Sequence, residues 1–232
     1  MLKKPGRASR VSSTVDHHYY PAFIDLRGKH CIVVGGGKVA ERKVAALLRS
    51  GAKVTVISPI VTGVLADHCE SKRIKHIKRK YRKGDLEDAF IVIAAASDRR
   101  VNQEVSLDAP FLLNVVDAPE LANFIVPSVV KRGPLALAVS TSGSSPALAK
   151  SIRKELEVFY GKQFGLFVDF LGKQRKKTLI NIADDGIRER LMKQIATPEM
   201  LGLLRKEGFK TTRNLILKII KGQRSNTAKC SR

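Results

Sequence analysis

The sequence has few of the features that mark a membrane-spanning, secreted or metal-binding protein. No apolar run approaches the roughly 20 residues that span a bilayer, so we expect a soluble protein with no membrane partner. Residues 1–18 are basic and polar and lack an apolar core, which predicts a flexible leader rather than a secretory signal. The 3 cysteines form no CxxC pair and the 5 histidines join no His/Cys cluster, which predicts no metal site and fits the cytoplasm. Cys31 lies in an apolar run and is expected in the core.

Acidic residues are also scarce. The chain has 43 Lys and Arg against 21 Asp and Glu, a net charge of +22, and the excess is densest in residues 151–232. Such a field attracts nucleic acid, an anionic membrane surface or a polyanionic small molecule, and charge alone does not distinguish them. The basic run at residues 72–83 is better explained as a solvated edge strand and loop than as a nucleic-acid arm, because no stacking platform or recognition motif accompanies it.

Short apolar runs alternate with helical patterns over residues 28–139. This alternation predicts an α/β fold with a parallel sheet built from βαβ units. The expected strands are residues 30–34, 53–58, 91–96, 111–116 and 135–139, and the expected helices between them are residues 38–50 and 99–109. After Pro146 the pattern becomes helical, with breaks at Gly161 and Gly165 and a typical helix start at Thr197-Pro198.

A glycine-rich segment, VVGGGKVA at residues 33–40, places a GxGxxA pattern between a strand and a helix. Gly35 permits the tight turn, Gly37 lets backbone amides approach a pyrophosphate, and the helix N-terminus attracts the phosphate charge. The pattern therefore predicts dinucleotide binding. The acidic residue that usually ends the second strand is missing, since Ser58 and Pro59 stand there. The choice between NAD and NADP stays open, and Ser58 is the candidate partner of a ribose hydroxyl or phosphate.

Four segments, in the same order along the chain, resemble one known family. They are GGGKVAERK at residues 35–43, AAASD with VN at 94–102, NVVD with FIVPS at 114–128, and AVSTSGSSPALA at 138–149. Together they resemble the N-terminal region of siroheme synthases and the precorrin-2 dehydrogenases over residues 18–210. The resemblance implies a Rossmann-like NAD-binding domain, a short dimerisation region and a helical C-terminal domain, in a homodimer.

The resemblance also implies domain boundaries and an activity. We expect a basic leader (1–18), an NAD-binding domain (19–116), a dimerisation region with a Ser-rich loop (117–150), a helical domain (151–220) and a flexible basic tail (221–232). Members of the family oxidise precorrin-2, a polycarboxylate tetrapyrrole, to sirohydrochlorin with NAD, and some then insert ferrous iron. Whether iron is inserted here stays open. The alternative is a non-catalytic NAD-sensing module, but such modules usually keep an acidic residue after the second strand.

The expected site residues fall into three groups. The cofactor group comprises Gly35, Gly36, Gly37, Ser58, Ser97 and Asp98, together with Lys38, Val39, Pro59 and Ile60, which the resemblance implies. The catalytic residue implied by the resemblance is Asp117, which follows an apolar strand at the edge where open α/β sheets bind ligands. Its alternative role is to cap the next turn. The substrate group comprises Asn114, Ser140, Thr141, Ser142, Gly143 and Ser144, where hydroxyls and a helix N-terminus suit carboxylates.

Overall fold

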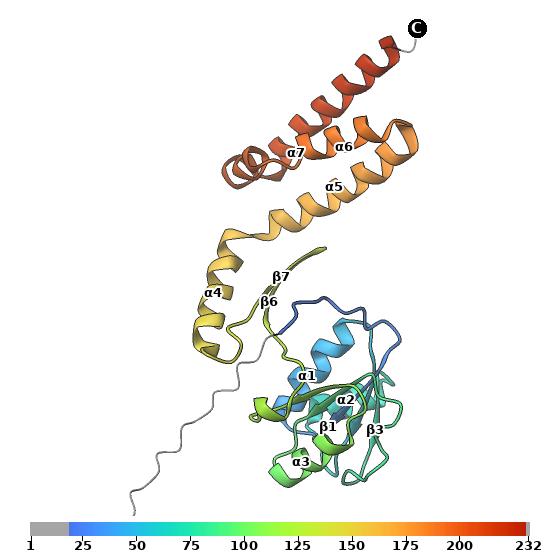
Figure 1. The fold of residues 1–232 in the computed structure, drawn as a ribbon, viewed down its shortest axis with the longest axis vertical. Coiled ribbons are helices and arrows are strands. Elements are labelled where there is room, and N and C mark those ends of the chain that lie inside the picture. Colours follow the sequence, from blue (N-terminus) through green and yellow to red (C-terminus); the bar gives the residue numbers. More distant parts are fainter. Residues whose placement is uncertain (1–18, 231–232) are drawn as a thin grey trace, which may run out of the picture. The chain divides into compact units, whose positions relative to one another are not determined.

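The computed structural model describes residues 19–230, which form two compact units divided between Val126 and Pro127 (Figure 1). The division lies beyond the expected boundary at residue 116, because the loop after the fifth strand folds back and bonds to that strand through Asn123. Within the described residues, no helix is long and apolar enough to cross a membrane.

The first unit contains a parallel sheet with helices on its faces (Figure 1), which confirms the predicted α/β fold. The strand order is β3 (Ile74–Ile77), β2 (Lys53–Ile57), β1 (His30–Val34), β4 (Ile91–Ala94) and β5 (Leu112–Val115). The helices are α1 (Lys38–Arg49), α2 (Gly63–Glu70) and α3 (Arg99–Asp108), followed by the short helix η1 (Pro119–Leu121). The chain winds in one direction from β1 to β3 and in the other from β4 to β5, so ligands are expected where the direction reverses.

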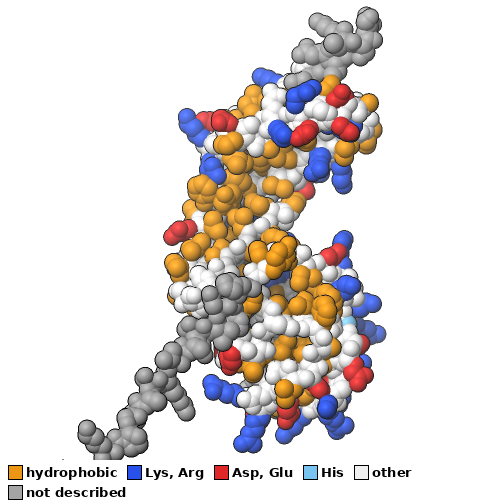
Figure 2. All heavy atoms as spheres, viewed as in Figure 1, with side chains coloured by type: hydrophobic (Ala, Val, Ile, Leu, Met, Phe, Trp, Pro, Cys, Tyr) orange, Lys and Arg blue, Asp and Glu red, His pale blue; other side chains and the backbone are white. Residues whose placement is uncertain are grey.

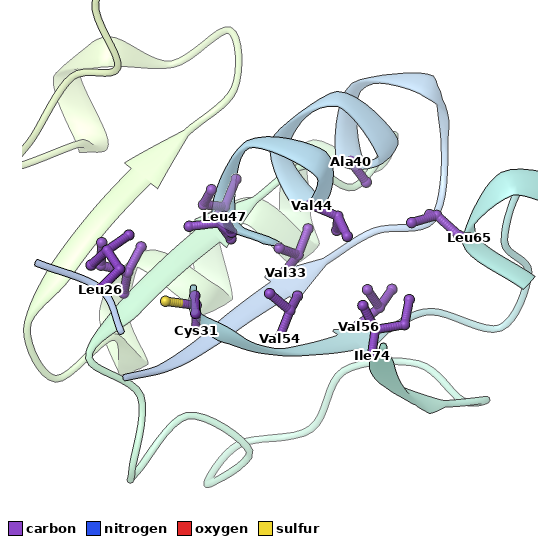
Figure 3. Close-up of a cluster of buried hydrophobic side chains, with 13 residues drawn as sticks. Leu26, Cys31, Val33, Ala40, Val44, Leu47, Val54, Val56, Leu65 and Ile74 are labelled. Atoms are coloured by element: carbon purple, nitrogen blue, oxygen red, sulfur yellow. The ribbon is translucent and has the colours of Figure 1, made fainter. Parts of the chain in front are cut away.

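One of the two buried hydrophobic clusters formed by the described residues of this unit lies between the sheet and α1 (Figure 3). Val33 and Val54 from the sheet meet Val44 from α1, and all three side chains are buried. Full burial of an aliphatic side chain of this size stabilises the fold by about 1.5–3 kcal/mol. Cys31 is fully buried, as predicted. The basic run at residues 72–83 contains the edge strand β3, which confirms the edge-strand interpretation for that part.

The second unit combines a hairpin with helices. The hairpin pairs β6 (Ser128–Arg132) with β7 (Leu135–Val139), and the helices are α4 (Pro146–Phe159), α5 (Lys162–Asn181), α6 (Asp185–Gln194) and α7 (Pro198–Cys230). The expectation that residues 135–139 add a strand to the parallel sheet is wrong. The two-residue link Gly133-Pro134 allows only an antiparallel return, because a parallel connection needs a dozen or more residues.

The helices follow the expected breaks only in part. Gly161 separates α4 from α5, whereas Gly165 lies inside α5 and packs closely against the backbone of Arg132. Helix α7 contains a non-helical residue, Gly208, with φ 81° and ψ 176°. It extends to Cys230, over residues for which the sequence predicts a loose tail; no proline interrupts that stretch. The expected leader, residues 1–18, lies outside the described residues.

Candidate functional site

The glycine turn between β1 and α1 lies against the carboxyl ends of β2 and β4. Gly35 has a φ of 126°, and its amide donates to the Ile57 carbonyl oxygen at 2.9 Å. A β-carbon on Gly35 would collide with the Ala95 carbonyl oxygen, and one on Gly36 would collide with the Ile60 carbonyl oxygen. A β-carbon on Gly37 would meet nothing within 4 Å, so open space remains at the start of α1. This is the space that a pyrophosphate needs.

A pocket of about 340 Å³ opens beside this turn at the carboxyl edge of the sheet. Its lining includes Gly35, Gly36, Gly37, Ser58, Pro59, Ile60, Ser97 and Asp98, all of which the sequence analysis assigns to the cofactor. Lys38 and Val39, also assigned to the cofactor, are outside the lining and form the first residues of α1. The pocket thus brings together three of the predicted segments, which are far apart in the sequence. Its residues fit a dinucleotide.

Lys80 and Tyr81 also line the pocket, and sequence reasoning did not assign them to it. They belong to the loop after β3, whose Ile77 is paired with Ile57 of β2. Because parallel strands end at the same edge of a sheet, this loop leaves β3 beside the end of β2. The signal in the sequence was an aromatic residue within a basic run directly after an edge strand.

The polar groups that end β2 and β4 have partners of their own. The Ser58 hydroxyl donates to the Ile60 carbonyl oxygen at 2.7 Å. The Asp98 carboxylate accepts from the Arg100 amide at 2.9 Å and caps the N-terminus of α3. Asn102, which the sequence analysis did not assign to the site, bonds both polar groups of the Ala96 backbone at 3.0 Å. These bonds fix the two strand ends that the cofactor would meet.

Asp117 lies in the turn directly after β5, at the same sheet edge as the pocket. Its φ is 60°, in a region that residues other than glycine rarely adopt, although Asp tolerates it better than most. Within residues 19–230 no hydrogen bond engages its exposed carboxylate, and η1 has no side-chain cap. Asp117 therefore does not cap η1, and its catalytic role stays a prediction.

The loop that carries Asp117 is closed at its base by two asparagines. The Asn123 side chain accepts from the Leu113 amide at 2.7 Å and donates to the Phe111 carbonyl oxygen at 2.6 Å. The Asn114 side chain donates to the Phe124 carbonyl oxygen at 3.1 Å. These bonds return the chain to β5 after the loop and hold Asp117 at the strand end.

Asn114 also receives a hydrogen bond from Lys43 of α1, with Nζ 3.1 Å from Oδ1. Burial lowers the pKa of Lys43, and the positive charge of Arg42 lowers it further. Both ends of the Asn114 amide therefore have partners within the protein. Its predicted role in substrate binding stays a prediction, and the structure adds a structural role that links α1 with the Asp117 loop.

The Ser-rich loop of the second unit, residues 140–145, joins β7 to α4. The Ser140 hydroxyl accepts from the Ser142 amide at 3.0 Å, and the Thr141 hydroxyl accepts from the Ser145 amide at 3.1 Å. Because both hydroxyls act as acceptors here, their protons remain available to donate. Ser145 caps α4 through the Leu148 amide, and Ser142 has a φ of 50°. Donors and a helix N-terminus together can hold an anion.

Two further observations concern metal binding and another cavity of the protein. Among the described residues, no group of three or more His, Cys, Asp or Glu side chains lies close enough to hold a metal ion. A larger cavity of about 880 Å³ lies in the second unit between α5, α6 and the start of α7, and it contains none of the predicted site residues. Size alone therefore does not identify the functional site here.

Comparisons with known proteins agree with this geometry. A family described as putative NAD(P)-binding matches residues 22–128, and one described as sirohaem biosynthesis protein central matches residues 132–158. The siroheme synthase of Methylobacillus flagellatus is 43% identical over 159 residues, which is 67% of this chain and 34% of that protein. Siroheme synthase 1 of Aeromonas salmonicida is 34% identical over 84% of this chain. The chain belongs to the siroheme synthase N-terminal and precorrin-2 dehydrogenase family.

A solved structure supports membership of this siroheme synthase family. The structure titled SirC, precorrin-2 dehydrogenase, aligns with a TM-score of 0.75 and 27% identity, covering 86% of this chain and 100% of that one. The chain covers only 34% and 42% of the two siroheme synthases above. The matches confirm the predicted family and a nicotinamide dinucleotide as the predicted cofactor.

Proposed function

We propose that the chain is an NAD-dependent dehydrogenase that oxidises precorrin-2 to sirohydrochlorin in siroheme biosynthesis. The observation that carries the proposal is the dinucleotide pocket at the glycine turn, in a chain that aligns with the full length of SirC, precorrin-2 dehydrogenase. The names of the siroheme synthase relatives point to the same pathway. We place the protein in the cytoplasm, where the tetrapyrrole and the nucleotide would both be available.

The oxidation removes a hydride and a proton from the substrate. Bound NAD supplies the hydride acceptor, so the protein has to position the macrocycle and receive the proton. We assign the proton to Asp117, because its carboxylate is exposed and has no hydrogen-bond partner among the described residues. A positioned general base contributes about 10²–10⁴-fold to a rate. The same carboxylate would serve iron insertion, in which the substrate nitrogens lose their protons.

The substrate carboxylates are assigned to the Ser-rich loop. Ser142, with a φ of 50°, and Gly143, with a φ of 88°, turn the chain there, and the Ser140 and Thr141 hydroxyls accept amide protons within the loop and keep their own protons for a ligand. Three non-glycine residues among the described ones have a positive φ, and two of them, Asp117 and Ser142, lie in the two loops that we assign to the substrate. Unusual backbone conformations gather at functional sites. The net charge of +22 would add long-range attraction for a polycarboxylate.

We further propose a homodimer that forms through the hairpin and α4. These elements leave several large apolar side chains exposed, namely Val129, Leu148, Val158 and Phe159. Figure 2 shows apolar side chains gathered at the surface of this unit. A monomer rarely leaves such side chains uncovered together, and a second copy of the chain would cover them.

The deciding experiment is an anaerobic assay with precorrin-2 and NAD, followed by absorbance, with ferrous iron added as a second substrate in a second stage. The first stage reports oxidation and the second reports iron insertion, so one trace separates the two reactions. We expect Asp117→Asn to lower the oxidation rate by about 100-fold or more while NAD affinity stays within about twofold. Glu120→Gln is the matched control, because Glu120 is an exposed carboxylate of the same loop.

Two outcomes would contradict the proposal, the first in its activity and the second in its catalytic residue. Wild-type protein that binds NAD without oxidising precorrin-2 would support the non-catalytic NAD-sensing alternative instead. An Asp117→Asn variant that turns over at the wild-type rate would show that Asp117 does not accept the proton. The dehydrogenase assignment would then rest on the dinucleotide pocket alone.

A further inference from the structure

The end of β2 has an unusual composition for a site that prefers NAD. Sites of this fold that select NAD usually place Asp or Glu there to bind the ribose 2′-hydroxyl, and sites that select NADP place a cation nearby for the 2′-phosphate. Here β2 is followed by Ser58, Pro59 and Ile60. The Ser58 hydroxyl donates its proton to the Ile60 carbonyl oxygen and lies against Gly36, so it can offer a ligand only an acceptor. No carboxylate at this strand end would repel a phosphate.

A cation takes the place of the missing carboxylate. Lys80 lines the same pocket as Ser58 and Ile60. It reaches that position because β3 runs parallel to β2, so the loop after Ile77 leaves the sheet beside the end of β2. The ribose end of the pocket therefore has a lysine where an NAD-selective site would have a carboxylate.

The two residues next to Lys80 in the sequence are held in place by hydrogen bonds. Arg79 forms a bidentate ion pair with Asp85, with both N–O distances at 2.7 Å, and also donates to the Lys80 carbonyl oxygen. The Tyr81 hydroxyl donates to Asp108 at 2.5 Å. With both neighbours anchored, the backbone of Lys80 is fixed against the pocket. A fixed backbone presents the ammonium group with less loss of conformational entropy on binding.

The charges of the pocket are also separated in space. Lys80 is the one cation of the lining and Asp98 the one carboxylate. Asp98 follows β4, which β1 separates from β2, and it caps α3. No carboxylate among the described residues forms an ion pair with Lys80, so its charge is available to a ligand. The positive charge lies at the ribose end and the negative charge at the other side of the glycine turn.

We propose that Lys80 makes the ribose end of this pocket accept a 2′-phosphate, so that the chain binds NADP as well as NAD. The inference rests on the proposed nucleotide-dependent function and specifies its cofactor. Lys80 is then the residue that decides the preference: its ammonium group pairs with the 2′-phosphate, whereas NAD offers it only a hydroxyl.

The test measures binding by calorimetry with the full chain, so it does not depend on turnover. The probes are NAD, NADP, and the pair ADP and 2′,5′-ADP, which differ by the 2′-phosphate alone. We expect 2′,5′-ADP to bind about tenfold more tightly than ADP, the size of one charge-assisted contact. Lys80→Gln should abolish that difference and weaken NADP about tenfold, while NAD changes less than about twofold.

Two further variants separate the local contact from the general field. Lys80→Glu should weaken NADP more than Lys80→Gln does, because it places a negative charge beside the phosphate. Lys75→Gln removes the same charge from an exposed residue of β3 that does not line the pocket, and it should leave the preference unchanged.

The outcomes also separate this inference from the proposed function. If NAD binds but NADP does not, or if Lys80→Gln leaves NADP affinity unchanged, the inference is wrong and the proposed function stands. An equal loss from Lys75→Gln likewise overturns it, since the effect would then come from overall charge. If neither dinucleotide binds, the proposed function fails and the inference fails with it.

Discussion

The strands of the two units bury their side chains to very different extents. In the first unit, every residue of β4 is buried, and so is every residue of β1 after His30. In the second unit, β6 and β7 contain a single buried residue, Val130, and its neighbour Val129 is 44% exposed. Both units contain strands rich in valine and leucine. Composition alone therefore does not determine burial.

The difference follows from sheet architecture. A parallel sheet has helices on both faces, so its central strands bury all their side chains within one chain. A two-stranded hairpin has no such cover and is marginal without packing against other elements. Helices α4 and α5 contact the hairpin, yet Val129 remains open. The first unit contains the dinucleotide pocket, and the second contains the exposed apolar surface that we propose as a dimer interface.

The largest expected effect tests the enclosed pocket of the first unit. In Gly36→Ala, the added methyl group would collide with the Ile60 carbonyl oxygen, so the turn must shift. We expect NAD affinity to fall by about 100-fold, close to 2.7 kcal/mol, measured by calorimetry. Gly63→Ala is the control, because its methyl group would meet nothing within 4 Å. Unchanged affinity in Gly36→Ala would show that the turn does not hold the nucleotide.

The next effect tests the open surface of the second unit. Val129→Glu places a charge on the exposed side of β6, and we expect it to weaken dimerisation by about tenfold or more, since a buried unpaired charge is unfavourable. Sedimentation over a concentration series measures this. Val64→Glu is the control, because Val64 is 43% exposed but lies on α2 in the first unit. Equal dissociation of both variants, or of neither, would contradict the proposed interface.

The same contrast explains which parts of the fold could be predicted. The parallel sheet was predictable because β-branched runs alternate with helical patterns, and the helix between two strands makes those strands parallel. The strand at residues 135–139 was predicted but assigned to the wrong sheet, because an apolar run does not reveal its partner. The two-residue link Gly133-Pro134 was the available signal, since so short a connection requires an antiparallel hairpin.

The site residues were predictable where a single continuous segment of the chain forms that part of the pocket. The glycine turn is continuous in sequence, and Gly35, Gly36 and Gly37 all line the pocket. Lys80 and Tyr81 enter the pocket only because β3 pairs with β2, a long-range contact that the local pattern does not encode. The hydrogen bond from Lys43 to Asn114 could not be predicted for the same reason, since it joins α1 to β5, which are far apart in the sequence.

A smaller effect is expected from that hydrogen bond. Lys43→Met keeps the length of the side chain and removes the donor to Asn114, so the base of the Asp117 loop should loosen. We expect kcat to fall about fivefold, because small displacements of a catalytic group lower rates, while NAD affinity stays unchanged. Lys53→Met, at an exposed position of β2, is the control. Faster hydrogen exchange in the Asp117 loop should accompany the loss, and a rate equal to wild type would separate Lys43 from catalysis.

The smallest effect concerns the chemical reactivity of a cysteine buried in the core of the first unit. Burial raises the pKa of the Cys31 thiol to about 11, so it stays protonated as the pH rises through the range from 7 to 9. Cys69, by contrast, is only partly buried. Because the thiolate is the reactive species, iodoacetamide at pH 8 should label Cys69 and leave Cys31 unmodified until denaturant opens the sheet. Peptide mapping by mass spectrometry distinguishes the two. Equal labelling in the native protein would mean that the first unit opens readily, and the contrast with the exposed hairpin would no longer hold.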